Sequence, residues 1–317
     1  MLRYMDSQTE KGLQEALVYL ESGNPVKAHK IIGNLFQTAL ECPELMYTTL
    51  ICTFWNGTVT RLATIENPYE RGETLLTEWK SFLTYISKQK NQYKPAFFAI
   101  QKGIFSLALR NYSELFNLPD NPQKAEIYRK AGMCYKKLGS FENACSCLSE
   151  ANKIQSNQAC ILAELADCYS LCGNDRSAKI LFREAFYIAP EKIDLDFLDS
   201  GLIRSLIDNL EPKKYSKRVL AEWIPVYGVL WGIFNIKKEL SSHELGKLKQ
   251  DIYAMEMEYK NPSCDAEVLV PRLLKNYFWL IDQYNMKSNM DAQVNEVLLK
   301  IKILDLYIYK LYTNNPV

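Results

Sequence analysis

Hydrophobic residues recur at helical spacing along most of the chain, which predicts α-helices rather than strands. In the stretch 77–88, Trp79, Phe82 and Ile86 fall on one side of a helix. The last segment, 290–312, places a broad hydrophobic stripe on one helix face. The stripe consists of Val294, Val297, Leu298, Ile301, Leu304, Ile308 and Leu311. We therefore predict an all-α protein with almost no β-sheet.

The same spacing predicts helices in the remaining parts of the chain. These helices are expected over 93–116, 195–210, 217–238, 242–259 and 265–284. Asn67 and Pro68 are expected to form a loop before the helix at 77–88, because proline restricts the residue before it and rarely continues a helix.

An internal repeat is the strongest pattern in the sequence. Residues 125–158 and 159–192 align without a gap at a period of 34, with nine identical positions. Each repeat is predicted to form a helix, a short turn at Gly139 or Gly173, and a second helix. Glycine just past a helix end supplies the left-handed backbone conformation that stops the helix.

This pattern resembles the tetratricopeptide repeat. The residues that carry the resemblance in repeat 159–192 are Ala166, Tyr169, Gly173, Ala178, Phe182, Ala185 and Pro190. Those in repeat 125–158 are Gly132, Tyr135, Gly139, Ala144 and Ala151, with Leu148 and Ser156 as departures. A weaker copy is predicted over 9–42, on Ala16, Tyr19, Gly23, Ala28 and Ile32.

The resemblance implies an α-solenoid, in which antiparallel helix pairs stack into a superhelix with a concave inner face. We predict degenerate repeats of this kind over 1–124 and two clear repeats over 125–192. The period fails beyond residue 192, so 193–317 is predicted to be a helical cap or an extra helical domain.

In the resembled family, the first helix of each repeat lines the concave face. The corresponding residues here are Glu126, Arg129, Met133, Lys136, Lys137, Cys160, Ala163, Asp167, Ser170 and Leu171. Arg129 and Lys136 would favour an acidic group or a C-terminal carboxylate, and Asp167 would disfavour a uniformly acidic ligand. A second interpretation is that these residues form only a solvated face, or are covered by neighbouring helices.

The copy near the N-terminus places three leucines on the corresponding face. They are Leu13, Leu17 and Leu20, between Glu10 and Glu21. A hydrophobic face of this kind should be covered. Either another helix of the chain or a second protein is expected to cover it.

Composition and charge exclude several classes of protein. The 317 residues include 38 Lys and Arg against 37 Asp and Glu, which gives a net charge of +1, and 48% are hydrophobic. Collagen, a disordered tail and a strongly basic nucleic-acid binder are excluded, and no nucleic-acid partner is expected. The low number of glycines, 13, agrees with a helical fold.

Candidate catalytic and metal sites are weak. Nine cysteines occur with only two histidines, His29 and His243. Cys168 and Cys172 share a helix face, but Cys145 and Cys147 do not, so packed thiols are favoured over a metal site or a redox switch. No phosphate-binding glycine loop and no cofactor motif are present. We expect no enzymatic activity, no cofactor and no metal.

The expected compartment is the cytoplasm, because the chain as given starts with polar residues and carries an odd number of cysteines within helices. The uncharged segment Trp223–Ile236 is shorter than the ~20 residues of a membrane span. The sequence therefore favours a scaffold or adaptor that binds a peptide or partner subunit. The alternative is a protein that binds a small ligand or a membrane surface through residues 223–236.

Overall fold

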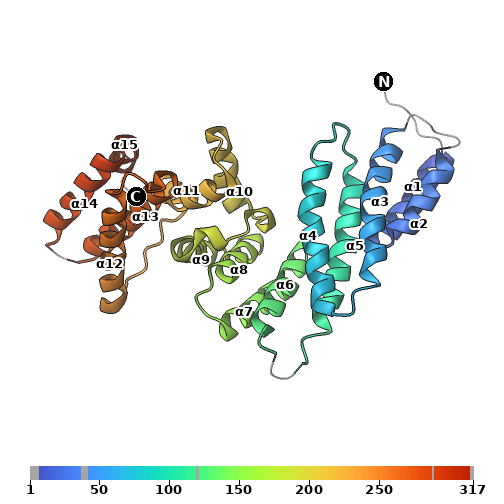
Figure 1. Ribbon diagram of the computed structural model, residues 1–317, viewed down its shortest axis with the longest axis horizontal. Coiled ribbons are helices and arrows are strands. Elements are labelled where there is room, and N and C mark those ends of the chain that lie inside the picture. The colour runs from blue at the N-terminus through green and yellow to red at the C-terminus, as the bar shows by residue number, and fades with distance from the viewer. Residues whose placement is uncertain (1–6, 37–41, 119–120, 288, 315–317) are drawn as a thin grey trace. The chain divides into compact units, whose positions relative to one another are not determined.

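The computed structural model describes residues 7–36, 42–118, 121–287 and 289–314, and within these ranges the chain contains helices and no strands. The all-α prediction is confirmed (Figure 1). The chain divides into two compact units, residues 1–154 and 155–317. This boundary falls between the two repeats, whereas the predicted division at 124/125 and 192/193 stays a prediction.

The N-terminal unit contains seven α-helices among its described residues. They are α1 (Ser7–Glu21), α2 (Pro25–Leu35), α3 (Pro43–Leu62), α4 (Pro68–Ile86), α5 (Lys94–Ser113), α6 (Lys124–Lys137) and α7 (Phe141–Ile154). Prolines stand in the first turn of α2 to α5, where the missing N–H has no helical partner in any case. The side chain of Asn67 caps α4 by accepting the N–H of Tyr69, so the loop expected at Asn67 and Pro68 is confirmed.

Helix α5 is central to the N-terminal unit, because it packs against α1, α3, α4 and α6. Trp55, Trp79 and Phe105 are fully buried between α3, α4 and α5, and the ring centroids of Trp79 and Phe105 are 5.0 Å apart. At the contact of α1 with α5, Gly103 lies against the backbone of Leu20. The three leucines of α1 are accordingly buried, and the chain itself covers the face that the sequence left open.

The C-terminal unit contains eight α-helices among its described residues. They are α8 (Ala159–Leu171), α9 (Asp175–Ile188), α10 (Gly201–Leu210), α11 (Lys217–Leu230), α12 (Ser242–Tyr259), α13 (Ala266–Asn285), α14 (Asp291–Leu304) and α15 (Leu306–Asn314). The short 3₁₀ turns Pro190–Lys192, Leu195–Phe197 and Glu211–Lys213 connect some of them. Helix α12 has the predicted bounds, and Ser241 with Glu244 forms a capping box at its start.

Two predicted helices end or break earlier than expected. The helix predicted over 217–238 ends at Leu230, because Gly232 takes a positive φ of 69° and the N–H of Phe234 donates to the carbonyl of Gly228 at 2.8 Å. The helix predicted over 290–312 breaks at Asp305, which has extended backbone angles. The Asp305 side chain accepts the N–H of Ile308 at 2.9 Å and so starts α15.

The apolar segment Trp223–Ile236 lies largely in the core of the C-terminal unit. Its residues from Ile224 to Leu230 are buried, as is Phe234, while Trp231 is 41% exposed. No helix among the described residues is long and apolar enough to cross a membrane. The segment therefore packs inside the protein and presents no continuous apolar surface.

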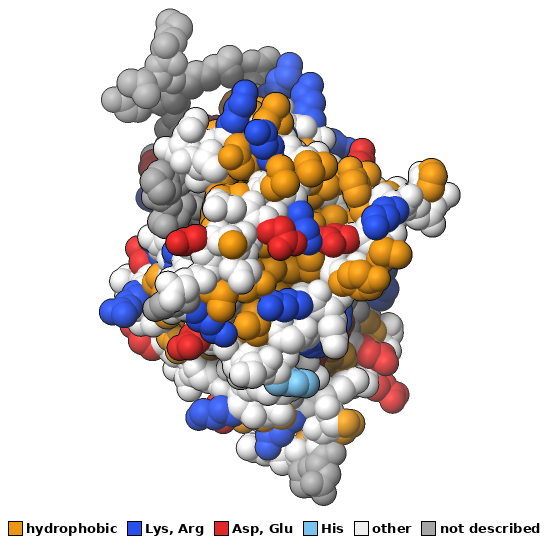
Figure 2. All heavy atoms as spheres, turned by 90° about the vertical axis from the view of Figure 1, so that its left-hand side faces the viewer, with side chains coloured by type: hydrophobic (Ala, Val, Ile, Leu, Met, Phe, Trp, Pro, Cys, Tyr) orange, Lys and Arg blue, Asp and Glu red, His pale blue; other side chains and the backbone are white. Residues whose placement is uncertain are grey.

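Exposed hydrophobic side chains occur on the last two helices instead. They are Leu299 and Ile303 on α14, with Leu306 and Tyr307 on α15. The face drawn in Figure 2 shows hydrophobic patches interrupted by charged side chains.

Lys275 of α13 is a charged group in the core of the C-terminal unit. Its ammonium donates to the carbonyl oxygens of Phe186 and Tyr187 at 3.1 and 3.3 Å, in the last turn of α9. Burial lowers the pKa of Lys275 to about 8. The charged form is therefore favoured more in the unfolded chain than in the folded protein.

This difference in pKa predicts a rise in stability with pH. Below pH 8, Lys275 is protonated in both states and its desolvation cost is fully present. Between pH 8 and about 10.4 the unfolded chain still binds the proton, so the free energy of unfolding increases, in total by ~3 kcal/mol. Urea unfolding of wild type and Lys275→Met at pH 7, 8, 9 and 9.5 checks this. The difference between them should be flat up to pH 8 and then rise; a constant difference would contradict the buried charge.

Candidate functional site

The two repeats fold as helix pairs, α6 with α7 and α8 with α9, and each pair is closely packed. Gly139 and Gly173 take positive φ angles of 76° and 80° at the predicted turns. Gly132 lets the first pair approach, because a Cβ there would lie 2.6 Å from the side chain of Leu148. The small residues and turn glycines of the sequence pattern thus have the expected roles in both pairs.

On α6, the charges predicted to face a ligand are engaged within the N-terminal unit. The guanidinium of Arg129 donates to both carboxylate oxygens of Glu126, with Nε at 2.7 Å from Oε2. Lys130 binds Glu73 at 2.9 Å, and the hydroxyl of Tyr112 donates to the same carboxylate at 2.6 Å. Arg129 therefore offers an acidic ligand less free charge than its sequence position indicates.

Burial divides the predicted residues of α6 into two groups. Met133 and Lys136 are buried, at 2% and 3% exposure. Glu126, Arg129 and Lys137 are half-buried. The expectation that Lys136 presents a charge to a partner is thus wrong for this structure, because its side chain lies inside the protein.

On α8, the structure places Asp167 in the core, with no exposed surface. Its two carboxylate oxygens accept the backbone N–H groups of Asp199 and Ser200 at 2.9 and 2.8 Å, where α10 begins. Asp167 therefore satisfies backbone donors at a helix N-terminus. The expectation that it faces a ligand is corrected. Ala163 is also fully buried.

The remaining candidates on α8 stay half-buried at its surface. They are Cys160, Ser170 and Leu171. The hydroxyl of Ser170 donates to the carboxylate of Asp175 at 2.8 Å across the turn. Since α6 and α8 belong to different units, the partner-binding groove as a whole remains a prediction.

The cysteines show the properties of packed thiols where their environment is resolved. Burial raises the pKa of the Cys52 thiol to about 12 and that of Cys147 to about 11. A raised pKa reduces the thiolate that nucleophilic and redox chemistry requires. Among the described residues, no group of three or more His, Cys, Asp or Glu side chains is arranged to hold a metal ion.

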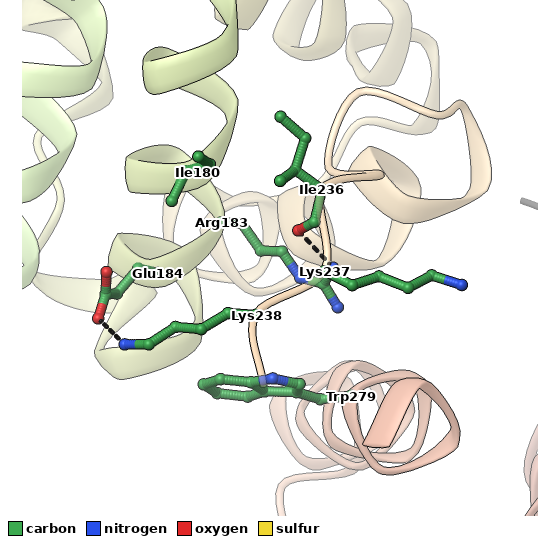
Figure 3. Close-up of a pocket in the computed structure, with 7 residues that line it drawn as sticks. All are labelled: Ile180, Arg183, Glu184, Ile236, Lys237, Lys238 and Trp279. Carbon is green, nitrogen blue, oxygen red and sulfur yellow. Dashed lines mark hydrogen bonds and ion pairs between the residues drawn. The ribbon is translucent and has the colours of Figure 1, made fainter. Parts of the chain in front are cut away.

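A pocket in the C-terminal unit was missed by the sequence patterns. It has a volume of about 220 Å³ and lies between α9, the segment 231–241 that connects α11 to α12, and α13 (Figure 3). Trp279 forms one wall, facing side chains of α9 and of the connecting segment. The pocket was missed because residues 231–238 were predicted as helix.

A family model described as the tetratricopeptide repeat matches residues 125–158. The predicted resemblance is therefore confirmed, and the chain contains a tetratricopeptide repeat that corresponds to α6 and α7. Repeat 159–192 has the same period and the same arrangement of two helices around a glycine turn. No curated protein matches the chain.

Proposed function

We propose that this protein is a non-enzymatic scaffold or adaptor that binds a peptide or partner subunit through the first helices of its repeats. The tetratricopeptide match at residues 125–158 carries this proposal, because such repeats generally mediate protein interactions. Stacked helix pairs present an extended surface that suits a peptide or a helix of another protein. We also propose the cytoplasm as its compartment, on the nine cysteines of the sequence.

The accessible part of the proposed surface differs from the full set of candidate residues. On α6 it consists of Glu126 and Lys137, with part of Arg129, and on α8 of Ser170 and Leu171. Lys137 is the cation on α6 that extends furthest toward the turn of the repeat and is half-buried. It is therefore the residue through which we test the surface.

We expect Lys137→Glu to reduce the capture of the partner by about tenfold, because a reversed charge at an interface adds repulsion and leaves the partner's group unpaired. The measurement is quantitative mass spectrometry of proteins retained by the tagged chain from native cells. The matched control is Lys153→Glu. Both lysines stand in the last turn of a helix of the same repeat, so both reversals oppose the helix dipole to a similar extent.

The control should change retention less than twofold, and both variants should melt at the wild-type temperature within a few degrees. Equal retention by the two variants would remove the first helices of the repeats as the binding surface. Loss from both would point to α7 or to a general effect of negative charge.

The alternative function, association with a small ligand or a membrane surface through residues 223–236, has less support. Most of that segment is buried in the core of the C-terminal unit. Its binding would require the core to open. The proposal of a protein-interaction role requires no such rearrangement.

A further inference from the structure

The pocket between α9 and α13 is held open by hydrogen bonds to the backbone of the connecting segment. Arg183 donates to the carbonyl of Ile236 at 2.9 Å. The side-chain amide of Gln283 accepts the N–H of Leu240 and donates to the carbonyl of Lys238, both at 2.8 Å. Three points of the segment are thus fixed to the neighbouring helices, and a pre-organised site of this kind avoids part of the ordering cost of binding.

The inside of the pocket is mostly apolar and its edge is cationic. Ile180 of α9, Ile236 of the connecting segment and the indole of Trp279 provide apolar walls. Lys237 and Lys238 line the pocket as well, and their side chains remain 32% and 47% exposed. Figure 3 shows the stem of Lys238 alongside the Trp279 ring.

The charges around the pocket do not cancel. Arg183 forms a buried ion pair with Asp282, and Lys237 lies 3.4 Å from the other oxygen of the same carboxylate. Lys238 pairs with Glu184 at 2.7 Å. Three cations therefore share two carboxylates, which leaves one net positive charge at the pocket, and this favours a negatively charged ligand.

Two N–H groups of the pocket residues lack an acceptor within the described part of the chain. They are Nε of Arg183, whose side chain is 6% exposed, and Nε1 of Trp279. Buried donors of this kind usually have a partner in native proteins. An oxygen of a bound ligand, or a water, would supply one.

We propose that this pocket binds a large apolar side chain of a partner peptide that stands next to an acidic residue. A volume of about 220 Å³ is below the ~300–1,000 Å³ of sites for drug-sized molecules, so it suits one side chain rather than a larger ligand. The apolar walls hold the side chain, and Lys237 with Lys238 attracts the carboxylate. The proposal rests on the protein-interaction role above and adds a second contact point, on the C-terminal unit.

The test uses ligand-observed NMR of the full chain with a short Gly/Ser peptide that contains Phe followed by Asp. We expect saturable binding at millimolar concentration or below, and a loss of about tenfold when Phe is replaced by Ala or Asp by Lys. Lys237→Met/Lys238→Met keeps the apolar stems and removes both charges, and should weaken binding about tenfold. Lys260→Glu, at the exposed end of α12, is the control and should leave binding unchanged.

A second variant acts on the shape of the pocket rather than on its charge. Ile180→Phe adds volume to the wall and should block the peptide while the melting temperature stays near that of wild type. No binding at about 5 mM peptide, or equal binding by all variants, would overturn the proposal. Equally tight binding of N-acetylphenylalanine would overturn the peptide assignment and indicate a small organic acid.

These results are separable from those of the proposed function. If Lys137→Glu leaves partner capture unchanged but the peptide binds the pocket, the surface on the repeats fails and the pocket holds. If Lys137→Glu abolishes capture and the peptide does not bind, only the pocket proposal fails.

Discussion

Gly103→Ala should destabilise the N-terminal unit by ~3 kcal/mol or more. A Cβ at Gly103 would lie 2.0 Å from the carbonyl oxygen of Leu20 and 2.8 Å from the backbone nitrogen of Gly23. These are backbone atoms at the end of α1, so no side-chain rotation relieves the overlap, and α1 must move away from α5. The gain in helix propensity from alanine, ~1 kcal/mol, is smaller than this cost.

Urea unfolding followed by circular dichroism measures the change in stability, and hydrogen exchange should place the loss in peptides from α1 and α5. Gly57→Ala is the matched control, because Gly57 also lies inside a helix of this unit and a Cβ there meets nothing within 4 Å. The control should stabilise the protein by about 0.5–1 kcal/mol. A Gly103→Ala variant as stable as wild type would mean that α1 does not pack this closely on α5.

Asp282→Ala should destabilise the C-terminal unit by ~3–5 kcal/mol. The ion pair of Arg183 with Asp282 joins α9 to α13, and both side chains are nearly fully buried, at 6% and 8% exposure. Removing the carboxylate leaves the guanidinium buried without its counter-charge, which costs more than the pair itself contributes. Lys237 would also lose its carboxylate partner.

The double variant Arg183→Met/Asp282→Leu distinguishes the lost partner from lost packing. It removes both charges and keeps apolar volume, so it should be clearly more stable than Asp282→Ala. Asp265→Ala breaks an exposed pair with Arg218 on the same helix region and should cost less than about 1 kcal/mol. If the double variant were as unstable as Asp282→Ala, the buried charge would not be the cause.

Local sequence signals located most helices, because helix starts and turns depend on neighbouring residues. Asn67 with Pro68, and Ser241 with Glu244, mark helix starts that the structure reproduces. Gly173 marks a turn because few residues other than glycine adopt its backbone angles. The same reasoning missed the break at Asp305, where an aspartate inside an apolar stripe acts as a helix cap.

The candidate site was predicted less well than the fold. Repeat position indicates which helix face a residue occupies, but burial depends on helices far away in the sequence. Asp167 occupies a position on the inner face of its repeat, yet it accepts hydrogen bonds from Asp199 and Ser200. No local pattern around Asp167 contains that information.

The sequence by itself determined the all-α class, the period of 34 residues and the tetratricopeptide repeat, because these follow from spacing and from the backbone preferences of glycine and proline. Only the tertiary structure decided that α5 covers the leucines of α1, and that Arg183 and Asp282 meet although they are 99 positions apart. The same holds for the pocket beside Trp279. Such contacts depend on which helix faces come together, and the apolar spacing of one helix does not specify its partner.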